Sequence, residues 1–253
     1  MTDKTIKGIK YSLDAKKQTA IVIARKKGYE GDIVIPETVV YQNVTYCVKG
    51  IAGSAFEGCS ALTSVAIPES VNEIGFNAFD GCTSLSTIHI PKKVKAIKDE
   101  TFRACSSLTS IKLPANIRSI SHGAFKGCTA LTKVVVLGKK LKAIRTFAFF
   151  GCSSLSSIHI PDSLELLSYS AFGGCSSLTT FDIPPQVSSI EEWAFASCES
   201  LSSMVIPDSV TNLEKGVFCA CTSLSSVSIG NGVSSIEQGT FGVGSGITTL
   251  RVG

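Results

Sequence analysis

Apolar and polar residues follow one fixed order from Cys59 to the C-terminus. The repeating unit reads G-C-x-S-L-x-x-I-x-I-P-x-x-V-x-x-I-x-x-x-A-F-x. Its cysteine returns every 23 residues, apart from one step of 24 between Cys128 and Cys152. A fixed period of this length predicts a solenoid, in which one short unit is stacked many times and packs only on its neighbours.

Each part of the unit predicts one structural element. The I-x-I stretch has the period of two that is typical of a strand, so both isoleucines are expected to point inward. Proline follows and ends the strand, because it has no amide hydrogen to donate. V-x-x-I predicts a second extended stretch, and A-F-x-G-C, which is too short for a full helix, predicts a 3₁₀ or α turn. The stacked I-x-I strands are expected to form a parallel sheet along one face.

Three apolar columns are expected to fill the interior of the stack. The leucine column comprises Leu62, Leu85, Leu108, Leu131, Leu155, Leu178, Leu201 and Leu224. The first inward strand position comprises Val65, Ile88, Ile111, Val134, Ile158, Phe181, Met204 and Val227. The phenylalanine column comprises Phe56, Phe79, Phe102, Phe125, Phe149, Phe172, Phe195, Phe218 and Phe241.

The first 50 residues do not carry the unit. Alternating apolar residues in 9–13, a turn at 14–17 and a β-branched run at 20–24 predict a hairpin. The next stretch, GDIVIPETVVYQNVTYCVKGIAGSAF, is similar to a repeat with an insertion. We therefore expect residues 1–50 to form a β-hairpin cap with a degenerate first repeat, and residues 51–253 to form a solenoid of about nine repeats, the last one incomplete.

The unit L-x-x-I-x-I-P…V-x-x-I-x-x-x-A-F-x-x-C resembles the BspA-like leucine-rich repeats, over about residues 30–253. This resemblance implies an α/β-type leucine-rich repeat solenoid, with mostly short parallel β-strands and 3₁₀ or α turns, curved into a right-handed superhelix. It also implies a protein without catalytic activity that serves cell-surface adhesion or protein recognition. Members are usually exported, whereas this N-terminus is polar and has no apolar signal segment. The expected location is the cell surface or outside the cell by resemblance, and the cytoplasm if the printed chain is complete.

The ten cysteines favour buried thiols. Eight of them occupy the same repeat position, and free cysteine behaves as a small buried hydrophobe. Neighbouring cysteines would lie about 5 Å apart, close enough for a disulfide. However, the side chains of an in-register ladder point the same way, so disulfides and metal ligation remain the less favoured alternatives.

The candidate ligand-binding face is the column of outward residues within I-x-I. Solenoids bind partners through exposed positions that differ between turns, and this column changes chemistry at nearly every step. Drift at a solvent-exposed position is the alternative explanation. The candidate partner-binding residues are His89, Lys112, Val135, His159, Asp182, Val205 and Arg251.

Charge is segregated along the chain. Residues 91–145 contain 13 basic and two acidic residues, whereas residues 146–253 contain two basic and nine acidic residues. The expected basic stripe at one edge comprises Lys92, Lys93, Lys95, Lys139, Lys140 and Lys142. Such a stripe would attract an acidic protein or a sulfated glycan, or simply be a solvated surface. Nucleic acid fits less well because no aromatic residues are interleaved for base stacking.

Several aromatic residues lie outside the apolar columns, among them Phe147, Phe150, Tyr169 and Trp193. Three of them fall near corresponding positions of successive repeats, so they either form an exposed contact patch or fill gaps around the inserted residue at 137–139.

The sequence argues against an enzyme. Its three histidines are dispersed, the serines have no neighbouring base, and no phosphate loop, zinc signature or dinucleotide motif occurs. We therefore expect no cofactor and no metal.

The function predicted from the sequence is a non-catalytic protein-binding scaffold, with a host or extracellular-matrix protein as partner. The alternative is a structural, self-assembling module that associates end to end, as in a homodimer, or through its oppositely charged halves. No apolar run is long enough to span a membrane.

Overall fold

The computed structural model describes residues 1–242 and 244–253, and these residues form strands and turns without a helix. The strands are β1 Thr2–Ile6, β2 Ile9–Asp14, β3 Thr19–Val22, β4 Gly31–Val34, β5 Thr38–Tyr41, β6 Val44–Ile51, β7 Leu62–Ala66, β8 Glu73–Ile74, β9 Thr87–Ile88, β10 Ala96–Ile97, β11 Ser110–Leu113, β12 Ser119–Ile120, β13 Lys133–Val136, β14 Ala143–Ile144, β15 Ser157–His159, β16 Leu166–Leu167, β17 Ser189–Ile190, β18 Ser203–Ile206, β19 Asn212–Leu213, β20 Ser226–Ile229 and β21 Thr249–Val252. None of the described segments is a helix that could cross a membrane.

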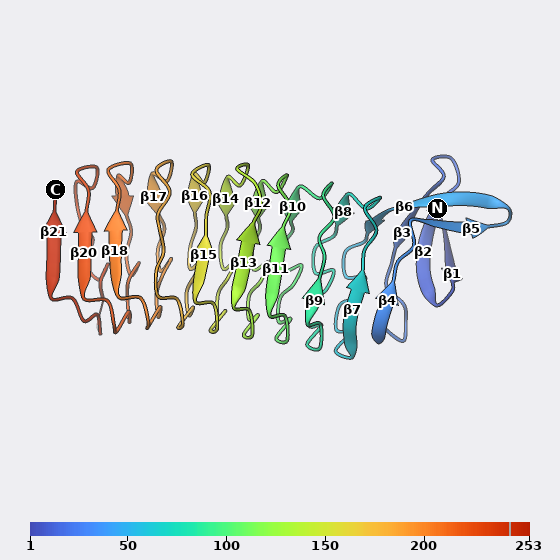
Figure 1. Cartoon of the computed structure of the whole chain (residues 1–253), viewed down its shortest axis with the longest axis horizontal. Coiled ribbons are helices and arrows are strands. Elements are labelled where there is room, and N and C mark those ends of the chain that lie inside the picture. Colours follow the sequence, from blue (N-terminus) through green and yellow to red (C-terminus); the bar gives the residue numbers. More distant parts are fainter. Residues whose placement is uncertain (243) are drawn as a thin grey trace.

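The turns stack side by side along the long axis, from the N-terminal strands at one end to β21 at the other (Figure 1). The I-x-I stretches form the front strands, and the V-x-x-I stretches end in two-residue back strands. Within a piece of the front sheet, each strand pairs in parallel with the corresponding strand of the next turn. For example, Ile111 of β11 pairs with Val134 of β13. The predicted solenoid of short parallel strands is confirmed.

The front sheet is not continuous, which the repeat pattern did not predict. It consists of three separate three-stranded pieces, β4-β7-β9, β11-β13-β15 and β18-β20-β21. The back strands, by contrast, form one parallel sheet in the order β10-β12-β14-β16-β17-β19. The second extended stretch of each unit therefore gives the more regular hydrogen-bonded ladder.

The N-terminal region contains more strands than the predicted hairpin. Strands β2 and β3 pair antiparallel as a hairpin, and β1 adds to the other edge of β2. Strand β3 then pairs in parallel with β6, whose own antiparallel partner is β5. The β5–β6 hairpin is the insertion in the first repeat. Its turn residues Gln42 and Asn43 have φ values of 48° and 61°, as a two-residue type I′ turn requires.

The A-F-x-G-C edge forms single turns closed by bonds from the amide of residue i to the carbonyl of residue i−3, as in the predicted 3₁₀ turn, and these turns do not extend into a helix. The amides of Phe79 and Gly81 donate to the next turn, to Thr101 O at 2.9 Å and Arg103 O at 2.8 Å. Only the alternate amides, such as that of Cys82 to Phe79 O at 3.1 Å, bond within their own turn. A helix needs successive amides to bond inside one segment, so sharing every second amide with the next turn prevents it.

Two residues in every turn of this edge have positive φ. The first directly precedes the Ala-Phe pair, and its members include Asn77, Glu100, Phe147, Ser170 and Trp193. The second directly precedes the cysteine and comprises Gly58, Gly81, Ala104, Gly127, Gly151, Gly174, Ser197 and Ala220. Glycine dominates the second column because a left-handed backbone strains any residue with a Cβ atom.

The phenylalanine column forms a stack of parallel rings through the core. From Phe56 to Phe241, neighbouring ring centroids lie 5.0–5.9 Å apart with interplanar angles of 5–12°. Tyr29 continues the stack into the first turn, 4.7 Å from Phe56 at a 47° tilt, and its hydroxyl donates to Ile23 O at 2.8 Å. Each aromatic pair adds about 0.5–1.5 kcal/mol beyond its buried area, so the stack couples every turn to the next.

The predicted ladder of buried thiols is confirmed, and all ten cysteines are free. Each thiol from Cys82 to Cys221 donates to the phenylalanine carbonyl of the preceding turn, with Sγ–O distances of 3.0–3.3 Å. Burial raises the pKa of Cys82, Cys152 and Cys221 to about 12. Cysteine suits this position because it is small and because its thiol donates a second hydrogen bond to a buried carbonyl. Without the thiol, that carbonyl would accept only one hydrogen bond.

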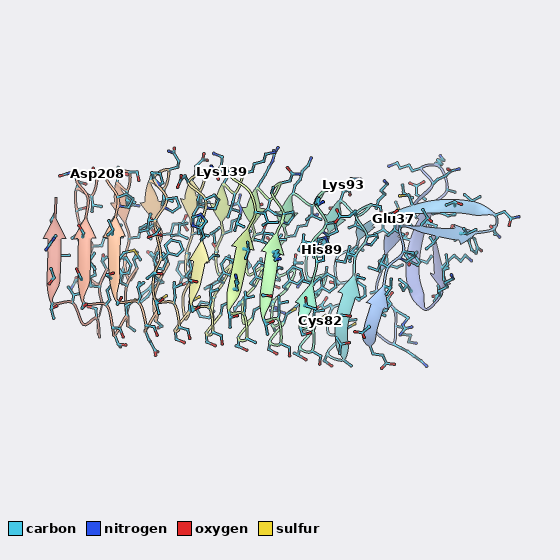
Figure 2. The ribbon with its side chains drawn as sticks, in the orientation of Figure 1. Glu37, Cys82, His89, Lys93, Lys139 and Asp208 are labelled. Atoms are coloured by element: carbon cyan, nitrogen blue, oxygen red, sulfur yellow. The ribbon has the colours of Figure 1, made fainter. Side chains whose placement is uncertain are left out.

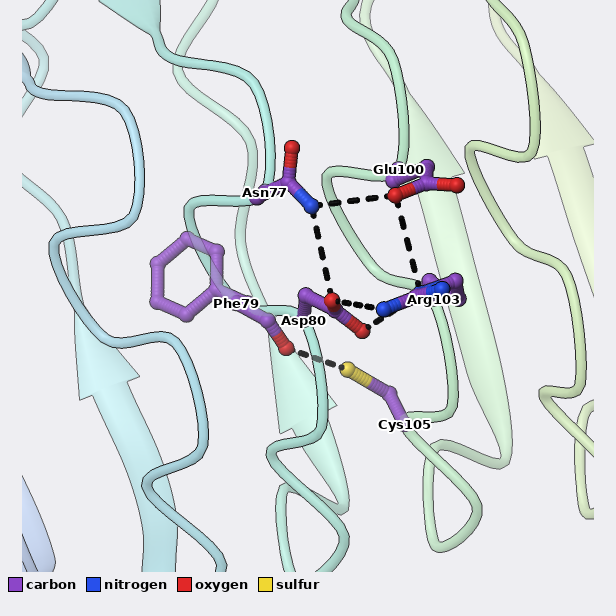
Figure 3. A network of polar contacts seen from close by, with 6 residues as sticks. All are labelled: Asn77, Phe79, Asp80, Glu100, Arg103 and Cys105. Atoms are coloured by element: carbon purple, nitrogen blue, oxygen red, sulfur yellow. Dashed lines mark hydrogen bonds and ion pairs between the residues drawn. The ribbon is translucent and has the colours of Figure 1, made fainter.

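A polar network joins two turns beside this ladder (Figure 3). Asp80 is 4% exposed, and its carboxylate accepts from Arg103 Nε at 2.9 Å and Nη2 at 2.6 Å. Asn77 Nδ2 donates to Glu100 Oε2 at 3.0 Å, and Glu100 lies 3.7 Å from Arg103 Nε. The hydrogen bonds to Asp80 raise the pKa of Arg103.

Candidate partner-binding face

The outward positions of the front strands form an exposed row. Strand β11 shows the reason: Ile111 and Leu113 are buried while Ser110 and Lys112 face solvent, because successive side chains of a strand point to opposite sides. The strand ladder places Lys112 beside Val135, and Val135 beside His159. The predicted residues of these three turns therefore lie next to each other.

The row continues in a second group of turns. Val205 pairs with Ser228 and Ser228 with Arg251 in the piece β18-β20-β21. Val205 is 67% exposed and adds an apolar side chain to this part of the row. Between the two groups lies Asp182, in a segment that forms no strand. The structure thus interrupts the predicted row at two places, between His89 and Lys112 and around Asp182.

Phe181 lies at the second of these breaks, beside Asp182. It occupies the inward position that other turns fill with Val, Ile or Met, and its ring packs edge-on between Phe172 and Phe195, with centroids 5.0 and 4.8 Å away. Beside it is a recess of about 260 Å³ lined by Thr180, Phe181, Asp182, Ile183, Ser203, Val205 and Pro207.

Sequence reasoning missed this recess. Its signal was a single residue, Phe181, in a column that is otherwise aliphatic or Met. The recess joins an apolar floor to the carboxylate of Asp182 and the hydroxyls of Thr180 and Ser203. Such a site can hold one apolar side chain while offering polar contacts at its rim.

His89 lies at the N-terminal end of the row and is held by a carboxylate. Its Nε2 is 2.8 Å from Glu69 Oε1, and the amide of Lys92 donates to Glu69 Oε2 at 3.1 Å. The hydrogen bond from His89 lowers the pKa of Glu69. His89 therefore already has a partner, whereas no ion pair involves Lys112, His159, Asp182 or Arg251 among the described residues.

The predicted basic residues lie at the edge that follows the front strands. Figure 2 shows Lys93 and Lys139 at the same edge as Glu37 and Asp208, with His89 on the front. All six predicted residues are exposed. Lys142 differs from the others because it is ion-paired with Glu165. Lys140 Nζ donates to Asn116 Oδ1 at 3.2 Å.

Three of the four additional aromatic residues come together at the turn edge. The Phe147 ring packs edge-on against Phe150 and Tyr169, with both centroids 5.3 Å away, and Lys126 Nζ lies 5.1 Å from the Phe147 centroid. Phe150 and Tyr169 each remain 37% exposed. Trp193 instead covers Gly216, where a Cβ atom would lie 2.6 Å from its ring. It makes no ring contact with Tyr169 within the described chain, so the contact patch holds three residues and Trp193 fills a gap.

The described residues offer no site for metal chemistry. No three His, Cys, Asp or Glu side chains among them lie close enough to hold a metal ion. In the same part of the chain, His159 and Asp182 form no ion pair with each other. The face has the chemistry of a binding surface: exposed cations, one carboxylate and apolar side chains.

Comparison with known proteins identifies the repeat. A family model described as "BspA type Leucine rich repeat region (6 copies)" matches residues 39–155 and 134–248. No curated protein matches the chain.

Three solved structures are similar in fold. A leucine-rich repeat protein from Bacteroides ovatus is 28% identical, with a TM-score of 0.70, covering 99% of this chain and 76% of that one. The T. pallidum leucine-rich repeat protein is 29% identical, with a TM-score of 0.67, covering 79% of this chain and 91% of that one. A leucine-rich cell surface protein from Faecalibacterium prausnitzii is 23% identical, with a TM-score of 0.61, covering 100% of this chain and 95% of that one.

Proposed function

The chain belongs to the BspA-type leucine-rich repeat family, and on this premise we propose that it is a non-catalytic scaffold that binds a protein along the front row. Leucine-rich repeat proteins generally bind proteins, and the repeated frame is rigid while the outward residue changes. The observation that carries the proposal is the exposed row itself, in which Lys112, Val135 and His159 lie on adjacent strands.

The recess beside Phe181 supplies an anchor point for such a partner. Protein interfaces gain most of their energy from a few apolar or aromatic side chains that enter well-packed pockets, with polar contacts around them. Val205, at 67% exposure, and the recess floor would contact the apolar side chain, and Asp182 at the rim would select a basic or hydrogen-bonding neighbour.

The biological setting we propose is adhesion at the cell surface to a host or extracellular-matrix protein. The BspA-type family is associated with bacterial surfaces, and the similar Faecalibacterium protein is described as a cell surface protein. An extended row on stacked turns suits a large protein partner, because such a partner can contact several adjacent turns at once.

The test is saturable binding to a panel of immobilised extracellular-matrix proteins. The front variant carries His159→Ala, Asp182→Ala and Val205→Ala. The control variant carries Glu192→Ala, Glu199→Ala and Lys215→Ala, three exposed residues outside the front row in neighbouring turns. We expect the front variant to lose affinity by about tenfold or more, as removal of central contacts does, and the control to keep it.

Two results would contradict the proposal. Equal binding by both variants would show that the front row is not the site. Absence of saturable binding to every matrix protein would exclude the adhesive role. Size measurements from low to high salt accompany the test, because assembly through the oppositely charged halves would appear as salt-sensitive oligomers.

A further inference from the structure

The edge that follows the front strands is basic over three consecutive turns and acidic on both sides of them. The first loop position after the proline carries Glu37 and Glu69 in the first turns, and Asp162 and Asp208 in later turns. In between, Lys92 occupies this position, Ala115 occupies it in the middle turn, and Lys139 follows Leu137-Gly138 in the third turn, which has no proline. Figure 2 shows Glu37, Lys93, Lys139 and Asp208 along one edge, so the basic section is a bounded patch.

The loops of these three turns form one connected surface. The amide of Val94 donates to Pro91 O at 3.0 Å, which closes a turn and places Lys92 and Lys93 at its tip. Asn116, in the next loop, donates to Lys92 O at 3.2 Å and accepts from Lys140 Nζ at 3.2 Å. The hydrogen bonds of Asn116 therefore join the first loop to the third.

The same three turns carry a second row of basic residues, each three positions further along the chain than the first loop position. The amide of Arg118 donates to Lys95 O at 2.8 Å, and the amide of Lys142 donates to Arg118 O at 2.8 Å. Lys142 is neutralised by Glu165, so Arg118 contributes a free charge that Lys142 does not. We define the basic patch as Lys92, Lys93, Lys95, Arg118, Lys139 and Lys140.

The charges of the basic patch are not neutralised by the protein. Within the described chain, no carboxylate forms an ion pair with any of its six side chains, and all six are exposed. Two acids of neighbouring turns are already paired, Glu69 with His89 and Glu165 with Lys142. Six uncompensated cations on adjacent loops create a local positive potential that attracts a polyanion.

We propose that the basic patch binds a linear sulfated polysaccharide. Adjacent turns lie about 4.8 Å apart, so the three turns present cations at regular steps over about 10 Å. Flexible lysines on an exposed edge suit sulfate groups repeated along an extended chain. The acidic turns on both sides limit the bound length to this section. This site is separate from the front row, so the polysaccharide would be a second ligand.

Other polyanions fit the basic patch less well. Single-stranded nucleic acid requires aromatic side chains for base stacking, and the patch has none. A protein partner requires an apolar interface core, whereas only Leu137, at 61% exposure, offers a large apolar side chain beside the patch in the described residues. The experiment therefore also tests single-stranded DNA and an acidic polypeptide as ligands.

The experiment measures binding of heparin by titration calorimetry. The patch variant carries Lys92→Gln, Lys93→Gln, Lys139→Gln and Lys140→Gln, all at exposed loop tips. The control variant carries Lys16→Gln, Lys17→Gln, Lys26→Gln and Lys27→Gln, which removes the same charge from exposed positions in the N-terminal region. We expect the patch variant to lose affinity at least about tenfold and the control to stay within about threefold.

Comparison probes identify the ligand class. Fully desulfated, N-acetylated heparin is expected to bind much more weakly than heparin, and affinity for heparin is expected to fall as NaCl is raised. The proposal is overturned if both variants lose affinity equally, if the desulfated chain binds as well as heparin, or if poly-glutamate or single-stranded DNA binds more tightly than heparin. The front variant with His159, Asp182 and Val205 replaced is expected to retain heparin binding, which separates this site from the proposed protein-binding row.

Discussion

Asp80 and Arg103 form a two-point ion pair across adjacent turns, with the Asp80 side chain 6% exposed and the Arg103 side chain 42% exposed. Arg103 therefore supplies most of the positive charge that compensates the buried carboxylate of Asp80 (Figure 3). The pair also fixes the spacing of the two turns at the edge where strands are absent, because both oxygens of one carboxylate are bound by one guanidinium.

Replacing Arg103 is expected to destabilise the protein more than replacing Asp80. Arg103→Gln leaves a buried carboxylate without its cation, which lowers the free energy of unfolding by about 3 kcal/mol. Asp80→Asn keeps the shape and removes the buried charge, so it costs about 1 kcal/mol. Urea unfolding of both variants and of the double variant measures the coupling. The exposed pair Lys98–Glu73 is the control, since Lys98→Gln should change stability by less than about 0.5 kcal/mol. Equal effects at both pairs would contradict this account.

The column of positive φ values before the cysteines predicts opposite effects of two matched substitutions. Ser197→Gly should raise the free energy of unfolding by about 1 kcal/mol, because glycine adopts φ 58° without strain. Gly174→Ala should lower it by about the same amount, since φ is 72° there and the nearest atoms leave room for a Cβ at 3.5 Å. Thermal or urea unfolding measures both. A stabilising Gly174→Ala would show that the backbone relaxes out of the left-handed region.

The thiol ladder predicts loss of stability in alkali. In the unfolded chain the cysteines titrate near 9.0, whereas burial raises the pKa of Cys82, Cys152 and Cys221 to about 12. Above pH 9 the native state therefore holds more protons than the unfolded state. The stabilisation is complete below pH 9 and is lost as the pH rises from 9 toward 12, by about 1.4 kcal/mol per pH unit for each such thiol.

Urea unfolding under reducing conditions at pH 8, 9 and 10 checks this slope. The double variant Cys152→Ala/Cys175→Ala is the control, because it removes two titrating groups and should flatten the dependence on pH. If the free energy of unfolding of the parent protein stays constant up to pH 10, the thiols do not determine its stability in alkali.

The interruption of the front sheet predicts uneven protection of backbone amides. Residues 180–183 form no strand, while 110–113 pair with the next turn as β11, so amide hydrogen exchange should be faster in the first segment. Phe181→Val should cost about 2–4 kcal/mol through the lost ring, and it should slow exchange in 180–183 if the ring is what separates the strands. Equal protection of the two segments in the parent protein would exclude the proposed effect of Phe181.

The period alone predicted most of the architecture, because every unit meets the same environment in a stack. The inward columns, the outward row and the buried cysteines follow from that rule: Leu108, Ile111 and Cys105 are buried as predicted, and Lys112 is exposed. The N-terminal region was predicted less completely. Strand β1 was not expected, because its exposed, charged sequence pairs only with the edge of β2.

Only the tertiary structure determined those features that arise from contacts between residues of adjacent turns. The Ala-Phe edge forms turns because alternate amides, such as that of Phe79, bond 22 residues away. Lys142 is ion-paired with Glu165 one turn on, which is why the proposed basic patch includes Arg118 instead. The recess beside Phe181 is lined by residues of two successive turns, among them Asp182 and Val205. The repeat in the sequence determines the stacked backbone and the buried columns. Contacts between different side chains of adjacent turns are not contained in a one-dimensional pattern, so only the tertiary structure determines them.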